Sequence, residues 1–373
     1  MTRAGEKKSI EAPIGLNGNG APAAQPVSFT GSCPVPIFDH KEIVLGHGSG
    51  GKLSHQLIQS LILPEFSNAL LEPLHDGAVF SIGDTRFAFS TDSFVVKPIF
   101  FPGGDIGELA IHGTVNDLAM CGANPLYLSA GFILEEGLAV DDFRRIVQSM
   151  KRAAAEAGVL LVTGDTKVVD RGKGDKIFIN TSGIGTIAPG VRIDPARAHA
   201  GDKIIINGPI AMHGIAIMSV REGLNFETEI TSDCASLNSL VAILLGAFPD
   251  VHVLRDPTRG GVASALTEIA ESAEVGIHLD EASIPITEEV KGACEILGFD
   301  PLYVANEGKL LAIVPEEGSD RVLAAMQAHP LGRAAAIIGE VVENHPGFVT
   351  MRTRVGGNRI VDMLSGEQLP RIC

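Results

Sequence analysis

From Lys41 onward, short runs of β-branched and aromatic residues alternate along the chain with longer segments of helical periodicity. Neither element can bury its apolar side alone, so helices are expected to pack on sheets. No segment of 20 to 50 residues repeats, which argues against a solenoid or a propeller. The pattern predicts a mixed α/β (α+β) protein. The expected strands cover residues 86–96, 160–164 and 176–187, and the expected helices cover Asp105–Met120, Asp141–Ala157 and Arg259–Ala273.

Two halves are expected because a polar, proline-containing connection at residues 191–202 precedes a fresh strand, "KIIING". Exposed connections of this kind mark domain boundaries. We therefore predict an N-terminal domain over residues 39–195 and a C-terminal domain over residues 196–362. Residues 1–38 are rich in Gly, Ala, Pro and Asn. They offer little apolar surface to offset the entropy of ordering, so we expect a disordered extension.

Charge and hydropathy exclude several classes of protein. The 373 residues are 45% hydrophobic and 20% charged, which allows real cores, and the formal net charge is −16. A surface of this sign repels phosphate backbones and anionic headgroups, so neither a nucleic acid nor a membrane partner is expected. No apolar run reaches the roughly 18 residues that span a bilayer, and the N-terminus lacks a signal-peptide core. These features predict a cytoplasmic location.

The five cysteines predict neither a disulfide framework nor a zinc site. Cys33, Cys121, Cys234, Cys294 and Cys373 show no CxxC or Cys/His spacing, and their odd number leaves at least one unpaired. Their pattern therefore points to no structural role that the cysteines share.

Cys373 differs from the other cysteines because it ends the sequence. Residues 363–373 contain Gly and Pro and few core residues, which predicts a flexible tail. From Asp362 the eleven extended residues reach roughly 36 to 40 Å at about 3.3 to 3.6 Å each. A thiol on such an arm is suited to act as a tethered nucleophile or group carrier. An accidental exposed thiol is the alternative. The terminal carboxylate should raise the pKa of the thiol, whereas Arg371 should lower it.

A glycine-rich segment, "GHGSGGK" at Gly46–Lys52, matches both a GxGxxG and a GxxxxGK pattern. A P-loop needs Ser or Thr after the lysine, whereas this chain has Leu53, and a Rossmann turn needs a ribose-binding acid within a βαβ unit. What remains is a loop with many exposed N–H groups and one ammonium, suited to cover phosphates. A plain glycine-rich turn is the alternative. The candidate phosphate-binding residues are Gly48, Ser49, Gly50, Gly51 and Lys52.

Four aspartates, Asp76, Asp92, Asp117 and Asp256, recur at expected strand ends or beside turns. Each alone is explained more simply as a cap or turn former. All four lie among small or apolar residues, where a lone carboxylate is costly, and this favours a metal cluster. Carboxylate oxygens are what Mg²⁺ demands, and nucleotide phosphates complete its octahedron. The "DPTRGG" that contains Asp256 also suits a phosphate-binding turn at a helix N-terminus.

Four further residues have uncertain roles. Lys167 in "GDTKVV" and Glu307 in "ANEGK" lie in turn-like contexts, where a solvated surface charge is the simpler explanation for either residue. His47 and His112 each suit a donor to phosphate or a satisfied turn residue.

A resemblance to a known family narrows these alternatives. The chain resembles the HypE family of hydrogenase maturation factors from about Lys41 to Cys373, and the terminal "PRIC" is the most specific part. More loosely it resembles the PurM-like ATPase superfamily, which includes selenophosphate synthetase and aminoimidazole ribonucleotide synthetase. The motifs that carry the resemblance are "HGSGGK", "STDSFVV", "NDLAMCGA", "GDTKVV", "RDPTRGG", "NEGK" and "PRIC".

The resemblance implies a PurM-like two-domain fold and a homodimer. The N-terminal domains would add their sheets to a shared β-barrel, each C-terminal domain would be α+β, and ATP would lie between the domains. The glycine-rich loop would cover the phosphates. The residues that would hold Mg²⁺ against the nucleotide are Asp76, Asp92, Asp117 and Asp256.

The resemblance also implies a reaction. HypF would carbamoylate Cys373, and the chain would dehydrate that group with ATP to a thiocyanate, with Lys167 and Glu307 flanking the reacting group. Lys167 would offset developing charge, and Glu307 is the candidate base. The cyanide would pass to iron on a HypC and HypD complex. In all, the chain would be a self-modifying, ATP-dependent carbamoyl dehydratase.

Two features depart from the family pattern, and two rival functions stay open. The family says nothing of the N-terminal extension, and His75 stands where relatives often carry a second acid. Another ATP-dependent reaction of the superfamily is the nearest rival, although no Cys adjoins the glycine-rich loop as selenophosphate synthesis would favour. A binding module that uses Cys373 as a metal ligand or mixed-disulfide partner is the rival of another class.

Overall fold

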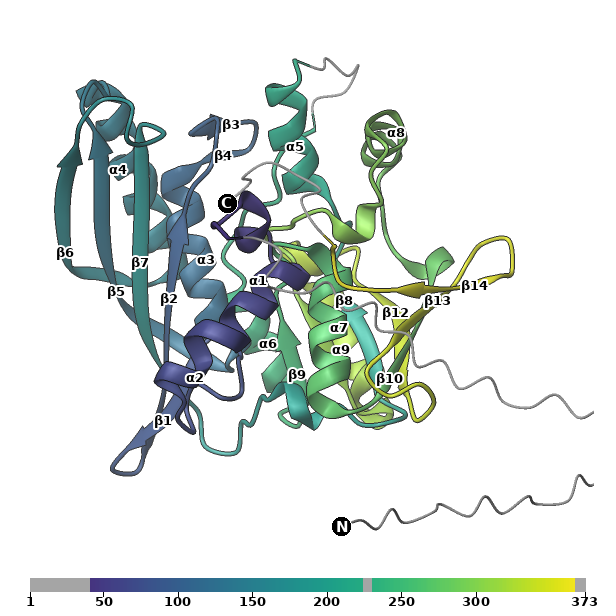
Figure 1. Cartoon of the computed structure of the whole chain (residues 1–373). Helices are drawn as coiled ribbons and strands as arrows, with labels where there is room; N and C mark the ends of the chain where they lie inside the picture. The colour runs from purple at the N-terminus through teal and green to yellow at the C-terminus, as the bar shows by residue number, and fades with distance from the viewer. Residues whose placement is uncertain (1–40, 224–229, 366–373) are drawn as a thin grey trace, which may run out of the picture. The chain divides into compact units, whose positions relative to one another are not determined.

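The strands expected from β-branched runs form the middle and one edge of the first sheet. The computed structural model describes residues 41–223 and 230–365. The three predicted strands are confirmed, and β1 and β5 join them in the order β1-β2-β7-β5-β6 (Figure 1). The strands are β1 (Ala78–Ile82), β2 (Thr85–Phe94), β5 (Ala123–Glu135), β6 (Leu160–Val169) and β7 (Ile177–Ile187).

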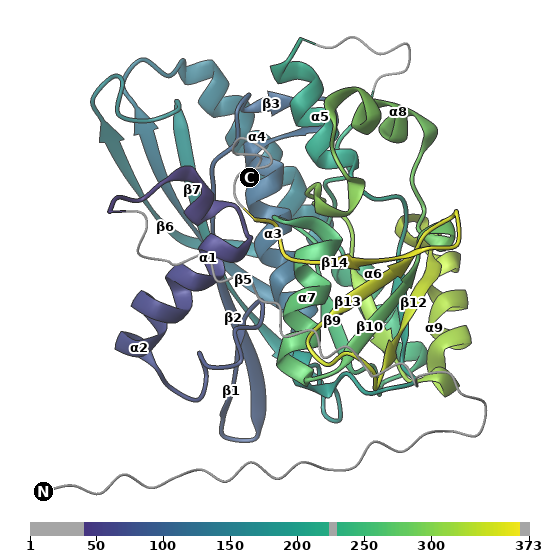
Figure 2. The same cartoon turned by 45° about the vertical axis from the view of Figure 1, so that its right-hand side comes forward.

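Two of the predicted helices cover one face of this sheet (Figure 1 and Figure 2). Helix α3 (Ile106–Met120) contacts β2, β5 and β7 and is buried on almost every side because its residues are small or apolar. The Asp105 carboxylate caps it by accepting the N–H groups of Gly107 and Glu108. Helix α4 (Val140–Ala157) packs beside α3 and also contacts the sheet, through β6 and through Phe143 on Phe132 of β5.

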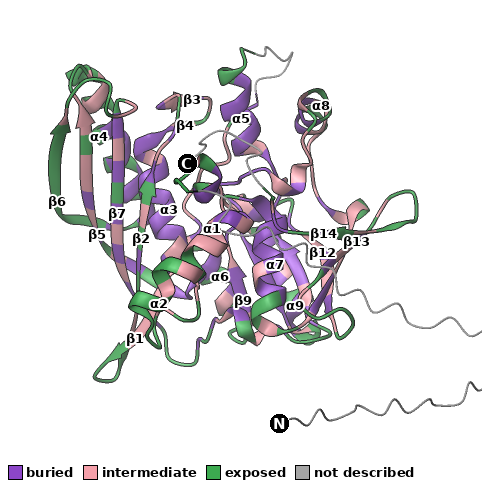
Figure 3. Cartoon of the chain, viewed as in Figure 1, coloured by how far each residue is buried: buried purple, intermediate pink, exposed green. Residues whose placement is uncertain are grey.

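The first sheet is open within the described chain. Its edge strands are β1 and β6, and β6 pairs in parallel with β5 only. Nearly all of β6 is exposed, as Figure 3 shows in green. A barrel closed by a second subunit therefore stays a prediction.

The second sheet has the strand order β14-β13-β10-β12-β8-β11-β9. Only the β10–β13 pair is parallel, and the other pairs are antiparallel. The strands are β8 (Lys203–Ile206), β9 (Val253–Arg255), β10 (Gly276–Asp280), β11 (Leu311–Val314), β12 (Ala336–Val342), β13 (Val349–Arg352) and β14 (Asn358–Val361).

Helices surround the second sheet and connect it to the first. Helix α6 contacts both α3 and α9, so one hydrophobic core runs through both halves. The third predicted helix is confirmed as α7. The helices of this half are α5 (Met212–Arg221), α6 (Asn238–Ala247), α7 (Gly261–Ala273), α8 (Glu288–Leu297) and α9 (Glu316–Ala328).

The two sheets lie on either side of residue 195, the predicted domain boundary. The first ends at Ile187, the second begins at Lys203, and the 3₁₀ turn η4 (Pro195–Arg197) lies between them. The described residues of both halves nevertheless form one compact unit, so the division into domains at 195 stays a prediction.

Several short elements complete the described chain. None of its helices is long and apolar enough to cross a membrane. The predicted disordered extension, residues 1–38, lies outside the described residues. The elements not yet named are η2 (Leu45–Gly48), α1 (Lys52–Leu57), η3 (Ile58–Ile62), α2 (Leu63–Phe66), β3 (Phe100–Phe101), β4 (Gly104–Asp105), η5 (Glu281–Ser283), η6 (Pro301–Tyr303) and η7 (Pro330–Gly332).

Candidate active site

A cavity of about 780 Å³ lies between the glycine-rich segment and the start of α7. Gly48, Gly50 and Gly51 line it on one side, and Arg259 lines it on the other. The backbone of Gly50 has φ +72°, and an added Cβ there would lie 2.6 Å from the Cβ of Arg259. Only glycine permits this close approach, which brings the loop over the cavity.

Three of the four predicted aspartates lie close together, and two of them, Asp76 and Asp256, line this cavity. Asp76, Asp117 and Asp256 each offer a ligand atom, and these atoms all lie within 4.8 Å of one another. Asp76 precedes β1, Asp117 lies in the last turn of α3, and Asp256 directly follows β9. The first sheet, its covering helix and the second sheet therefore each supply one carboxylate. We call these three residues the aspartate cluster.

Asp92, the fourth predicted aspartate, lies beside the cluster. Alternation along β2 turns it toward α3 together with Ser90, whose hydroxyl donates to Asp117 Oδ2 at 2.7 Å. The carboxylate of Asp92 lies 3.9 Å from the guanidinium of Arg259. Arg259 thus faces both the cavity and the fourth carboxylate.

Burial and mutual repulsion make the aspartate cluster reluctant to ionise. Burial raises the pKa of Asp76 to about 6 although Arg255 opposes the shift. Burial, and next the charge of Asp76, raise the pKa of Asp256 to about 8. Burial and the charges of Asp256, Asp92 and Asp76 raise the pKa of Asp117 well above its ordinary value. A cation bound among these carboxylates would remove the repulsion.

One oxygen in the cluster has no hydrogen-bond partner. Asp76 Oδ2 is buried and unsatisfied, whereas Oδ1 pairs with Arg255 at 2.9 Å. A buried carboxylate oxygen without a partner is costly, and a hard cation is the partner that suits three converging carboxylates. The donor set therefore fits Mg²⁺. Whether one ion or more binds is set by these residues together with the nucleotide.

Arg255 and His75 act on the cluster, and sequence patterns assigned no role to Arg255. Its guanidinium binds Asp76 and, at 2.6 Å, Glu268 of α7. Burial, and next the charge of Arg255, lower the pKa of His75 to about 4, so His75 is neutral beside the cluster. Arg255 directly precedes Asp256 in "RDPTRGG", and this adjacency was the available signal.

The turn in "DPTRGG", for which the sequence predicts phosphate binding, lies at the N-terminus of α7. Gly260 and Gly261 have φ +78° and +62°, and a Cβ on Gly261 would lie 2.4 Å from the Leu302 carbonyl oxygen. Glycine is therefore required where the chain turns from Asp256 into the helix. Thr258 and Arg259 of this turn line the cavity, so a positive helix end and a guanidinium face the same space.

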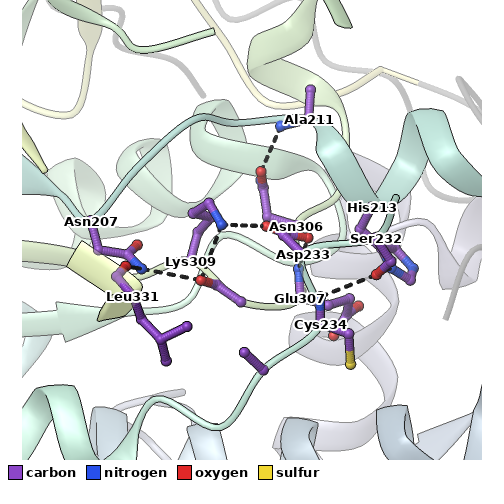
Figure 4. Close-up of polar contacts among 12 residues, drawn as sticks. Asn207, Ala211, His213, Ser232, Asp233, Cys234, Asn306, Glu307, Lys309 and Leu331 are labelled. Atoms are coloured by element: carbon purple, nitrogen blue, oxygen red, sulfur yellow. Dashed lines mark hydrogen bonds and ion pairs between the residues drawn. The ribbon is translucent and has the colours of Figure 1, made fainter. Parts of the chain in front are cut away.

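Glu307 lies in a buried clamp that joins three segments (Figure 4). Its N–H donates to Asp233 Oδ1 at 3.2 Å, and Asp233 Oδ2 pairs with the Lys309 ammonium at 2.9 Å. Asn116 of α3 donates to the carbonyl oxygens of Ala235 at 3.0 Å and Glu307 at 3.3 Å. Sequence patterns predicted neither Asp233 nor Lys309. Lys309 stands in the recognised "NEGK", but nothing local marks Asp233.

The carboxyl group of Glu307 is not used by this clamp. It is buried, and its Oε1 has no hydrogen-bond partner. Burial, and next the charges of Asp256, Asp92 and Asp233, raise its pKa well above the ordinary value. Cys234 lies close by, since the charge of Glu307 adds to burial in raising the pKa of the Cys234 thiol. Burial and the charge of the neighbouring carboxylates therefore both favour the protonated form of Glu307.

Lys167 lies elsewhere, and its predicted turn context is wrong. It lies inside β6, where its backbone pairs with Ile133 of β5, because the β-branched residues around it continue the strand. Its ammonium is exposed and binds Asp165 at 2.5 Å. The Lys167 side chain is 68% exposed on β6, whereas Glu307 is buried. A shared role for them stays a prediction.

Ser49 and Lys52 do not line the cavity. The Ser49 hydroxyl donates to the Gly46 carbonyl at 2.8 Å. The Lys52 ammonium pairs with Asp362, and its N–H donates to the Leu364 carbonyl at 2.9 Å. The end of the described chain is thus fixed beside the glycine-rich loop, and Met363 is buried. Cys373 and the rest of the predicted tail lie outside the described residues.

His47 and His112, for which the sequence allowed two roles each, both have a local hydrogen-bond partner. His47 Nδ1 accepts the N–H of Val44 at 3.0 Å, and the residue also lines the cavity. His112 is buried and lies 2.5 Å from the Ser236 hydroxyl, and burial lowers its pKa to about 4. His112 therefore fits a satisfied core residue, whereas His47 keeps access to the cavity.

Known proteins share this architecture. The chain matches the AIR synthase related protein family, with the N-terminal domain at residues 74–187 and the C-terminal domain at residues 199–352. The carbamoyl dehydratase HypE of Cupriavidus necator is 57% identical over 332 residues, which cover 89% of this chain and 95% of that protein.

Two solved structures support the same family. A HypE in complex with ATP is 51% identical, with a TM-score of 0.76 over 89% of this chain and all of that one. The HypE of a HypE–HypF complex is 48% identical, with a TM-score of 0.79 over 83% of this chain and 99% of that one. The chain belongs to the HypE family of carbamoyl dehydratases, enzymes of hydrogenase maturation.

Proposed function

We propose that this chain uses ATP and Mg²⁺ to dehydrate a carbamoyl group carried on the thiol of its own Cys373. The product is a thiocyanate whose cyanide becomes a ligand of the iron in [NiFe]-hydrogenase. The observation that carries the proposal is the aspartate cluster, which opens on the cavity with one unsatisfied oxygen, Asp76 Oδ2. A relative solved with ATP supports the choice of nucleotide.

Different residues around the cavity would bind the metal ion and the phosphates. Asp76, Asp117 and Asp256, with Asp92 beside them, would hold Mg²⁺, and the N-terminal turn of α7 would face the phosphates. Bound Mg-ATP supplies an electrophilic phosphoryl group and charge neutralisation. Three glycines of the loop, Gly48, Gly50 and Gly51, line the cavity and would exclude water, which protects an activated carbamoyl group from hydrolysis.

The dehydration balances as follows. The carbamoyl oxygen takes the terminal phosphoryl group of ATP and leaves as phosphate, so the C–O bond breaks and ADP is released. The nitrogen loses two protons as the C≡N bond forms on the Cys373 sulfur. One proton remains on hydrogen phosphate and the other is released to solvent.

Glu307 is the residue that we propose takes a proton from the nitrogen. Its raised pKa favours the protonated form in the metal-free site, and burial is the first cause. The charges of Asp256 and Asp92 are the next causes, so neutralising them lowers the pKa of Glu307. Glu307 then becomes a base only when the site is loaded, which limits wasteful ATP hydrolysis.

The described end of the chain lies near the proposed site. Leu364 is bound to Lys52, beside the lining residue Gly51. The nine residues from Leu364 to Cys373 span at most about 30 to 32 Å at about 3.3 to 3.6 Å each. This distance is ample for the thiol to enter the cavity of its own subunit.

A homodimer is part of the proposal. Edge strand β6 exposes Leu160, Val162 and Val168, with 64%, 59% and 68% of each residue accessible. A long apolar edge strand is an aggregation hazard unless another chain covers it. A second copy that pairs there would form the family's shared barrel and cover Lys167. HypF and a HypC–HypD complex are the proposed partners, and the cytoplasm is the proposed location.

The proposal is tested by the intact mass of protein carbamoylated at Cys373, measured before and after Mg-ATP. We expect the loss of one water, and no loss in Cys373→Ala protein or without ATP. ATP consumption with an unchanged mass would instead indicate another reaction of the superfamily. A binding module would show no Mg²⁺-dependent ATP turnover that Asp92→Asn abolishes.

A further inference from the structure

A second group of metal-binding side chains lies outside the cavity, where strands β8 and β9 begin. It consists of His199, Asp202 and His252, whose ligand atoms all lie within 4.8 Å of one another. Strands β8 and β9 both run antiparallel to β11 and therefore begin at the same edge of the sheet. The fold thus brings together residues that are about 50 positions apart in the sequence.

The backbone fixes both ligand-bearing segments. Within the first, the Asp202 N–H donates to the His199 carbonyl at 3.0 Å, and the Asp202 carbonyl accepts the N–H of Val341 in β12 at 2.9 Å. On the second, the N–H of His252 donates to the Ile313 carbonyl of β11 at 3.0 Å. The three side chains are therefore held by the sheet edge, as a preorganised site requires.

The side chains converge from three directions. His252 Nδ1 lies 2.8 Å from Asp202 Oδ2, and the rings of His199 and His252 lie 5.2 Å apart at 66°. Adjacent donors on one tetrahedral ion, with bonds of about 2.0 to 2.2 Å, are separated by about 3.3 to 3.6 Å. The 2.8 Å between Asp202 Oδ2 and His252 Nδ1 is a hydrogen-bond distance, and a small increase in this spacing admits an ion.

The burial of the three residues differs in a way that suits a binding site. The side chains of Asp202 and His252 are 6% and 13% exposed, whereas His199 is exposed. Asp202 is oriented by the N–H of His199, which donates to Oδ2 at 2.8 Å. An ion would enter from the His199 side and keep a position open for water.

We propose that His199, Asp202 and His252 form a second cation site, selective for Zn²⁺ over Mg²⁺. Two imidazoles and one carboxylate are a set that zinc accepts, while Mg²⁺ prefers oxygen ligands. To bind, His252 presents the lone pair of Nδ1 and carries its hydrogen on Nε2. The bound ion fixes the start of β9, the strand that leads to Arg255 and Asp256.

The test uses the full-length chain with Cys373→Ser, saturated with Mg²⁺, and titrates it with Zn²⁺ by calorimetry and with Co²⁺ by visible absorption. We expect one equivalent to bind and His199→Gln to weaken binding by at least about tenfold. This variant keeps the Asp202–His252 hydrogen bond, so it should fold. His278→Gln, which removes a histidine bonded to Thr350 at 3.1 Å, is the control and should bind normally.

Three outcomes would overturn the site. These are no binding in the presence of Mg²⁺, equal affinity in His199→Gln, or a thiolate-to-cobalt absorption band that assigns the ion to a cysteine. The first would leave Asp202 and His252 as a hydrogen-bonded pair. The readout is metal affinity, so it is independent of whether the chain dehydrates a carbamoyl group.

Discussion

Two groups of buried acids in this chain are balanced in opposite ways. In the aspartate cluster, Asp117 and Asp256 lie close to Asp76, and within the described chain Asp76 alone of the three forms an ion pair, with Arg255. In the clamp, Asp233 is paired with the Lys309 ammonium at 2.9 Å. The Asp233 carboxylate thus has a cationic partner without any ligand, whereas the cluster stores repulsion that a cation relieves. The buried charges of the clamp therefore have a structural role, whereas those of the aspartate cluster are suited to bind a cation.

The largest expected effect is a loss of stability when the buried ion pair of the clamp is broken. Lys309→Met should lower the free energy of unfolding by about 3 to 5 kcal/mol, because it leaves the Asp233 carboxylate buried and unpaired. Adding Asp233→Asn should restore part of this loss, which urea unfolding measures. Lys203→Met, which removes a more exposed pair with Glu340, is the matched control and should cost about 1 kcal/mol or less. Equal effects of the two lysine variants would contradict the distinction.

The aspartate cluster should respond in the opposite direction. Asp256→Asn should lower Mg-ATP-dependent dehydration by about 100-fold, equal to about 2.7 kcal/mol at 1.36 kcal/mol per factor of ten. The same change should stabilise the metal-free protein, because it removes a carboxyl that burial keeps protonated to a pKa of about 8. Activity is read from the mass change at Cys373, and stability from thermal unfolding without Mg²⁺.

A surface variant serves as control for that prediction. Asp250→Asn removes a carboxylate that is 66% exposed and pairs with Arg197. It should change neither dehydration nor metal-free stability appreciably. If Asp256→Asn destabilised the metal-free protein instead, the cluster would be a structural network like the clamp.

The pH dependence of stability is the next largest effect. The folded pKa values of about 6 for Asp76 and about 8 for Asp256 lie above the ordinary value of 3.8. The folded state therefore holds protons that the unfolded chain releases above about pH 4. Stability of the metal-free protein should fall as pH rises from about 4 to about 8, by at least about 1.4 kcal/mol. Saturating Mg²⁺ should flatten this slope in urea titrations, and an unchanged slope would argue against cation binding at the cluster.

The same contrast explains what the sequence could predict. Asp76, Asp117 and Asp256 each lie in a distinctive local motif. The motifs were therefore enough to predict that the three aspartates belong to one site. The β-branched runs likewise predicted β2 and β7, and the helical periodicity predicted α3 and α7. These predictions needed only local patterns, because the burial of each element shows in the spacing of its apolar residues. The fold class therefore followed from short-range pattern.

Long-range pairings were not predictable in this way. Asp233 and Lys309 lie 76 positions apart, and His199 and His252 lie 53 apart, so no local spacing marks either pair. Lys167 was misplaced for the converse reason. The small residues beside it suggested a turn, but pairing with β5 extends the strand through it. Sheet topology, which the sequence does not display, decided all three outcomes.

The smallest expected effect concerns an exposed ion pair that belongs to neither group. Lys52 and Asp362 pair with side chains 26% and 56% exposed, so Lys52→Met should change the free energy of unfolding by about 1 kcal/mol or less. The Lys52 N–H still binds the Leu364 carbonyl, because the substitution spares the backbone. The root of the tail should then stay in place, and dehydration should fall only a few-fold. A loss near that of Asp256→Asn, with ATP affinity unchanged, would instead mean that the ammonium acts on the reacting group.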